Sequence, residues 1–141
     1  TILRNVVVTG YYTGILVNEL TDGENIVVAS NINGLEFVFA HHASRFGRVG
    51  TYRNTHHLTV SGKHGFSIEQ MNTEQPGPGQ TNTNNAWQAL VSDINDPKNL
   101  GFGDINYWVV EGAVGAVKKF TRNGGASIQA RRIGSAPVGN K

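Results

Sequence analysis

Three carboxylates lie on or near one segment of the chain where acid–base chemistry is possible. Glu69 and Glu74 sit close together, and Asp93 follows beyond a long polar stretch. Hydrolysis of a glycosidic bond needs two carboxyl groups, one acting as acid and the other as base or nucleophile. The alternation in Phe66-Ser67-Ile68-Glu69 predicts that Phe66 and Ile68 face a core while Ser67 and Glu69 face outward. Glu69, Glu74 and Asp93 are therefore candidate catalytic residues, against the plain alternative of solvated surface carboxylates.

Aromatic and basic side chains supply candidate contacts to a sugar. Trp87 closes a polar loop, and aromatic rings of this kind can stack on sugar rings. Four of the five histidines and three arginines lie in or beside the segment 40–57. A polysaccharide lyase would need a base beside a uronate and cations that hold its acid group, which Arg45, Arg48, Arg53 and His41 could provide. The candidate carbohydrate-binding residues are Trp87, Tyr52, His41, His42, Arg45 and Arg48.

The sequence predicts neither a metal site nor a cofactor. In His41-His42 and His56-His57 the neighbouring side chains would point to opposite faces of a strand, so at most one of each pair can serve one site. Cysteine is absent, which excludes disulfides, thiolate metal sites and a cysteine nucleophile. No Gly-Lys-Ser/Thr follows the glycines, which excludes the usual phosphate-binding loop.

The elements that would position these residues repeat along the chain as strand, tight glycine turn and strand. Copies of this repeat unit begin at Asn5, Asn25 and His57, and a looser copy begins at Asn106. The segment Ser127–Ile133 starts a fifth copy. The spacing from Asn5 to Asn25 is typical of a β-solenoid, in which each coil packs on the next. A sandwich would need antiparallel hairpins, whereas glycine turns at the same place in each unit favour coils. Asn5 and Asn25 are interpreted as bend residues that tolerate a left-handed backbone and stack above one another.

Composition predicts a single domain, residues 1–141, rich in strands and turns. Charged residues make up only 16% of the chain and glycine contributes 18 of 141 positions. The formal net charge of +2 comes from scattered Lys and Arg, which argues against a nucleic-acid surface. No apolar run reaches the roughly 18 residues that a membrane span needs. Because the chain opens at Thr1 inside a strand pattern, we expect a piece of a larger or processed protein.

Several segments resemble bacterial pectate-lyase-like right-handed parallel β-helix proteins. They are Asn5-Val6-Val7-Val8-Thr9-Gly10, Asn25-Ile26-Val27-Val28-Ala29-Ser30 and His57-Leu58-Thr59-Val60-Ser61-Gly62. Gly65–Gln70 and Phe120–Gln129 are similar to segments of large secreted bacterial β-helix proteins. The resemblance covers nearly the whole chain and implies a polysaccharide ligand and an extracellular setting, secreted or phage-borne. It assigns no catalytic residue, because lyases, glycoside hydrolases, phage tailspikes and carbohydrate-binding modules share the coil pattern.

The sequence thus predicts an all-β, right-handed parallel β-helix of about five coils, with one long inserted loop at about 71–103. The expected function is that of an extracellular polysaccharide-acting protein of the glycoside hydrolase or lyase type. The alternatives are a carbohydrate-binding module without catalysis and a structural or adhesive shaft like that of a tailspike. Because open coil ends expose strand edges, we expect the rest of a larger chain or a homo-oligomer to cover them.

Overall fold

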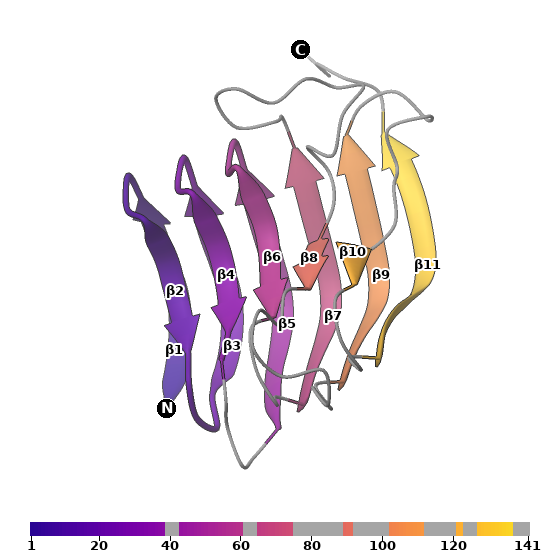
Figure 1. The fold of residues 1–141 in the computed structure, drawn as a ribbon, viewed down its shortest axis with the longest axis horizontal. Helices are drawn as coiled ribbons and strands as arrows, with labels where there is room; N and C mark the ends of the chain where they lie inside the picture. The colour runs from indigo at the N-terminus through magenta and orange to yellow at the C-terminus, as the bar shows by residue number, and fades with distance from the viewer. Residues whose placement is uncertain are drawn as a thin grey trace.

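The computed structural model describes residues 1–38, 43–60, 65–74, 89–91, 102–111, 121–122 and 127–136 (Figure 1). These ranges contain strands, bends and turns, in agreement with the predicted all-β class. No helix in them is long and apolar enough to cross a membrane.

The chain alternates between two parallel sheets that lie face to face (Figure 1). The six-stranded sheet contains, in order, β1 (Ile2–Thr9), β3 (Asp22–Ala29), β5 (Ser44–Tyr52), β7 (Gly65–Glu74), β9 (Phe102–Glu111) and β11 (Ser127–Ala136). The five-stranded sheet contains β2 (Thr13–Val17), β4 (Asn33–Phe37), β6 (His56–Val60), β8 (Ala89–Val91) and β10 (Thr121–Arg122). Each coil adds one strand to each sheet, and this arrangement is the predicted parallel β-helix.

Three coils, β1–β2, β3–β4 and β5–β6, are described almost throughout, whereas the sequence predicts about five. The strands β7 to β11 extend both sheets in the same order. The segment predicted as one long loop at about 71–103 is partly regular, because β7 continues through Glu74 and β8 occupies Ala89–Val91. Residues 75–88 and 92–101 lie outside the described residues.

The strand register corrects one part of the predicted repeat. Val6 pairs with Ile26 and Ile26 pairs with Val49, so the step from the second coil to the third is longer than the step from the first to the second. The repeat unit at His57 was predicted to be equivalent to the one at Asn25. It lies instead in the five-stranded sheet, where Leu58 pairs with Leu35. That alignment was wrong because strands of both sheets alternate apolar and polar residues in the same way.

The core lies between the two sheets and is built from rows of inward side chains. One row reads Leu3, Gly23, Phe46, Ile68 and Ile105, and the next reads Val6, Ile26, Val49, Met71 and Trp108. From the five-stranded sheet, Phe37 stacks on Phe66 with ring centroids 4.3 Å apart and meets Phe46 edge-on at 5.7 Å. The buried Trp108 donates its indole N–H to Thr73 Oγ1 at 2.8 Å, so its polar atom is satisfied inside the core.

Asn5 and Asn25 occupy a bend within the first two long strands. Their φ angles of 55° and 54° are left-handed, which asparagine tolerates better than most residues. Two successive outward residues therefore interrupt the alternation before Val6 and Ile26 turn inward again. The Asn25 Nδ2 donates to Asn5 Oδ1 at 3.1 Å, which confirms the predicted structural role of this pair.

A second pair of asparagines holds the turn from the long strands to the short ones. Asn31 and Asn54 are both buried and follow residues with φ angles of 55° and 52°. Asn54 Oδ1 accepts hydrogen bonds from the backbone N of Asn31 at 3.0 Å and from Asn31 Nδ2 at 3.1 Å. Asn54 Nδ2 donates to the carbonyl oxygen of Val28 at 2.9 Å. The Asn54 side chain thereby satisfies buried polar groups of the preceding coil and joins the turns of two coils.

We expect Asn54→Ala to lower the free energy of unfolding by roughly 2–4 kcal/mol, because it leaves several buried polar groups without partners. Asn33→Ala is the matched control, since the Asn33 side chain is half-buried and donates to the Glu36 carboxylate at 3.2 Å. Urea unfolding followed by circular dichroism would measure both. Equal losses in the two variants would contradict the role given to Asn54.

Candidate functional site

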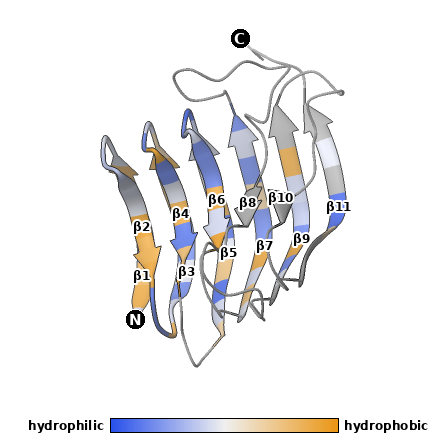
Figure 2. Cartoon of the chain, viewed as in Figure 1, coloured by the Kyte–Doolittle hydropathy of each residue, from blue (hydrophilic) through white to orange (hydrophobic). Residues whose placement is uncertain are grey.

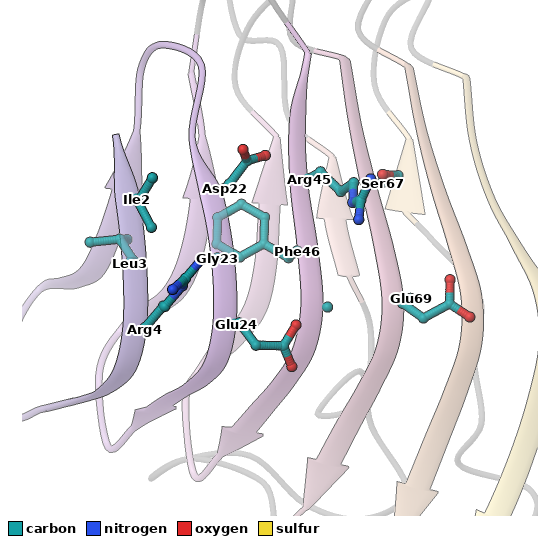
Figure 3. Close-up of a pocket in the computed structure, with 11 residues that line it drawn as sticks. Ile2, Leu3, Arg4, Asp22, Gly23, Glu24, Arg45, Phe46, Ser67 and Glu69 are labelled. Atoms are coloured by element: carbon teal, nitrogen blue, oxygen red, sulfur yellow. The ribbon is translucent and has the colours of Figure 1, made fainter.

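A hollow of about 700 Å³ lies on the outer face of the six-stranded sheet (Figure 3). It is lined by Ile2, Leu3, Arg4, Asp22, Gly23, Glu24, Arg45, Phe46, Gly47, Ser67 and Glu69. These residues come from the first halves of four neighbouring strands, β1, β3, β5 and β7. Since neighbouring strands are about 4.8 Å apart, the hollow crosses about 14 Å of the sheet along the coil axis.

The register sets opposite charges side by side in this hollow. Asp22 pairs with Arg45, Arg45 pairs with Ser67, and on the next outward position Arg4 pairs with Glu24. All five side chains are exposed. The hollow therefore offers guanidinium donors and carboxylate acceptors at the spacing of adjacent coils.

Gly47 creates a gap in the row of outward side chains between Glu24 and Glu69. A Cβ atom at Gly47 would overlap the Glu24 carboxylate, so that carboxylate lies over β5. Glu69 lies on the next strand and accepts a hydrogen bond of 2.6 Å from Asn106 Nδ2 on β9. Figure 3 shows the Glu24 side chain directed toward β5 and the Glu69 side chain directed toward β9. The backbones of β3 and β7 are two strand spacings apart, about 10 Å.

An ion pair continues the polar surface beyond the hollow. Arg131 on β11 binds Asp104 on β9, with Nη2 at 2.7 Å and Nε at 2.8 Å from Asp104 Oδ2. The hydrogen bond to Asp104, and then its charge, raise the pKa of the Arg131 guanidinium above its ordinary value. Asp104 pairs in register with Ser67, so the charged surface runs on from the hollow without a break.

Two of the predicted site residues, Glu69 and Arg45, are brought together in the hollow. As predicted, Ser67 and Glu69 face outward while Phe66 and Ile68 are buried. Glu74 ends the same strand, about 16 Å along it from Glu69, which is too far for two carboxylates that flank one glycosidic bond.

The other predicted site residues lie elsewhere. Arg48 is exposed on β5 but does not line the hollow, and Tyr52 is half-buried with its ring against Gly50. His41, His42, Trp87 and Asp93 lie outside the described residues.

Arg4, Asp22 and Glu24 line the hollow although they were not among the predicted site residues. A signal for two of them was present, because Arg4 and Glu24 each directly precede the asparagine that opens a repeat. Aligning the first two repeats by Asn5 and Asn25 would have put these charges side by side.

The histidine pair on β6 does not form a shared site. His57 is fully buried and His56 is half-buried, as expected for neighbours that point to opposite faces of a strand. Burial lowers the pKa of His56 below its ordinary value because desolvation disfavours the imidazolium form. Among the residues that the structure describes, no three His, Asp or Glu side chains gather as potential metal ligands.

No protein-family model matches this chain, no curated protein matches it in sequence, and no solved structure matches it. A function for the hollow has therefore to be inferred from the chemistry of its lining residues.

Alanine substitutions at two glycines should differ in their effect on stability, because one glycine faces the core and the other faces the hollow. At Gly23 an added methyl group would overlap the buried ring of Phe46, so we expect Gly23→Ala to cost roughly 1–3 kcal/mol of stability. At Gly47 it would meet only the flexible end of Glu24, so Gly47→Ala should change the free energy of unfolding by less than about 0.5 kcal/mol. Thermal unfolding of both variants would test this, and a large loss for Gly47→Ala would contradict the surface position of the Glu24 carboxylate.

Proposed function

We propose that the protein binds polysaccharide chains along the hollow on the six-stranded sheet. The observation that carries the proposal is the lining itself, which combines two arginines, three carboxylates and Ser67 across four successive coils. Carboxylates accept hydrogen bonds from sugar hydroxyls, and guanidinium groups donate to hydroxyl and ring oxygens. A surface that repeats at each coil suits a ligand that also repeats along its length.

The charges favour a neutral polysaccharide over an acidic one. Carboxylates outnumber arginines in the lining, so a chain of uronates would meet net repulsion. The three arginines considered for a lyase do not gather in the hollow, because Arg45 alone lines it, Arg48 lies on β5 outside it and Arg53 follows the end of β5. We therefore favour glycoside binding or hydrolysis over elimination.

The proposal includes an extracellular setting and kinship with pectate-lyase-like β-helix proteins. Both are supported by the resemblance of the repeat units at Asn5 and Asn25 to segments of such proteins. Both are also compatible with the parallel β-helix. The resemblance implies a polysaccharide ligand and an extracellular compartment. The residues that would contact the ligand are those that line the hollow.

Hydrolysis is a second candidate function, and Glu24 and Glu69 are the observation that favours it. The Glu24 carboxylate lies over Gly47, and Glu69 lies on the next strand of the same hollow. Inverting glycosidases keep their two carboxyl groups roughly 6.5–9.5 Å apart so that a water molecule fits beside the sugar. Side chains on strands about 10 Å apart can reach that separation. In this scheme one carboxyl group protonates the leaving oxygen and the other activates the water.

Binding is tested by Arg45→Ala with Arg48→Ala as the matched control on the same strand. Loss of a charge-assisted hydrogen bond in the hollow should weaken the binding of a neutral polysaccharide by about tenfold or more in Arg45→Ala. Arg48→Ala should bind as the wild type does, because Arg48 does not line the hollow. Affinity electrophoresis or calorimetry on a panel of neutral and acidic polysaccharides would measure both. Equal weakening in the two variants, or binding of acidic chains alone, would count against the proposal.

Hydrolysis is tested by Glu24→Gln and Glu69→Gln. If the pair acts as acid and base, either change should lower the rate of oligosaccharide release by about 10²–10⁴-fold, with inverted configuration at the new reducing end in the wild type. Glu36→Gln on the five-stranded sheet is the control and should leave the rate unchanged. Binding without release would keep the protein as a carbohydrate-binding module. Neither binding nor release would leave a structural shaft.

A further inference from the structure

A row of hydrogen-bond donors crosses the outer face of the six-stranded sheet beside the hollow. It contains Arg48 on β5, Gln70 on β7, Tyr107 on β9 and Arg132 on β11, and we call it the donor row. The register pairs Arg48 with Gln70, Gln70 with Tyr107 and Tyr107 with Arg132, so the four residues lie on successive coils. Hydrophilic and hydrophobic colours alternate along β5 and β7 in Figure 2, as expected for strands with one face in the core and the other outside.

The donor row differs in charge from the hollow. It carries two arginines and no carboxylate, whereas the outward rows that precede it along the strands carry Asp22, Glu24, Glu69 and Asp104. The outward row that follows it is uncharged and contains Gly50, Asn72, Val109 and Gly134. In the part of the chain that the structure describes, neither Arg48 nor Arg132 is ion-paired. Two exposed arginines without a carboxylate partner are suited to binding anionic groups.

Contacts within and beside the donor row hold its side chains in position. The Arg132 guanidinium lies over the Tyr107 ring, with its carbon 4.3 Å from the ring centroid. A guanidinium that stacks through its face keeps the N–H groups at its edge for another acceptor. Gln70 Nε2 donates to Asn72 Oδ1 at 3.1 Å, which fixes the Gln70 amide between the two arginines. Side chains that are fixed before binding lose less conformational entropy when a ligand binds.

The spacing of the two arginines indicates an extended ligand. Arg48 and Arg132 lie on strands three spacings apart, about 14 Å, which is wider than one carboxylate or sulfate group. We propose that the donor row binds a polysaccharide that carries carboxylate or sulfate groups, at a site separate from the hollow. Single-stranded nucleic acid, another extended polyanion, is bound through open aromatic faces. The Tyr107 ring is already stacked under Arg132, so the donor row favours the polysaccharide.

The site is tested by Arg48→Ala and Arg132→Ala, with Arg53→Ala as the matched control. Arg53 is also exposed but follows the end of β5, so all three changes remove one positive charge and only two of them touch the donor row. The probes are dextran, which is neutral, dextran sulfate and the carboxylated polysaccharide hyaluronan. Calorimetry at physiological ionic strength would measure each affinity, because exposed charges far from the row are then largely screened. Circular dichroism would show whether the variants are folded.

The wild type should bind dextran sulfate, hyaluronan or both, and the probe that binds identifies the anionic group. Arg48→Ala and Arg132→Ala should each raise the dissociation constant for that probe by about tenfold or more, through loss of a charge-assisted hydrogen bond, and should leave any binding of dextran unchanged. Arg53→Ala should bind as the wild type does. Equal weakening in all three variants would indicate unspecific attraction and overturn the proposal. Absence of binding to both anionic probes, or tighter binding of single-stranded DNA, would also overturn it.

Arg45→Ala distinguishes the donor row from the hollow, because Arg45 lines the hollow and Arg48 does not. This change should leave the affinity for the anionic probe unchanged. Loss of that affinity in Arg45→Ala alone would place the anionic chain in the hollow and contradict a separate site.

Ligand length tests whether both arginines contact one chain. Glucose 6-sulfate can reach one arginine only, so it should bind at least about tenfold more weakly than a sulfated dextran oligosaccharide long enough to reach both. Equal affinities for the two ligands would contradict binding at two points. None of these outcomes depends on whether the hollow binds neutral chains.

Discussion

Stacking of parallel coils in register is the constraint on which the rest of the structure depends. Each position in a coil lies about 4.8 Å from the same position in the next, so every side chain must suit its neighbours above and below. Asn54 shows the constraint most clearly, because its amide bonds both the backbone and the side chain of Asn31 in the preceding coil. The same register aligns Arg4 with Glu24 and Asp22 with Arg45 on the outer face. The charged lining of the hollow is therefore a consequence of the same register that stacks the coils.

Within a row of stacked side chains, a glycine leaves room for a large side chain of the neighbouring coil. Inside, Gly23 and Gly103 leave room for the rings of Phe46 and Phe66, and those rings pack around Phe37 from the opposite sheet. Outside, Gly47 leaves room for the Glu24 carboxylate. The inner glycines serve the close packing of the core, where an added methyl group has no space. The outer glycine affects the shape of the surface. A substitution at Gly47 should therefore alter the hollow without disturbing the core.

The repeat of strand, glycine turn and strand predicted the fold class, and local alternation predicted the facing of individual residues. The repeated phrase indicated stacked coils, the pattern around Phe66 put Ser67 and Glu69 outside, and the bend at Asn5 and Asn25 followed from asparagine chemistry. The contacts between coils could not be predicted in this way. Glu24 and Glu69 share a surface because two successive coil steps separate them, and the length of each step is visible only in pairs such as Asp22–Arg45 and Arg45–Ser67. Alternation of apolar and polar residues also cannot distinguish the two sheets. For this reason the repeat unit at His57 was aligned with a strand of the wrong sheet.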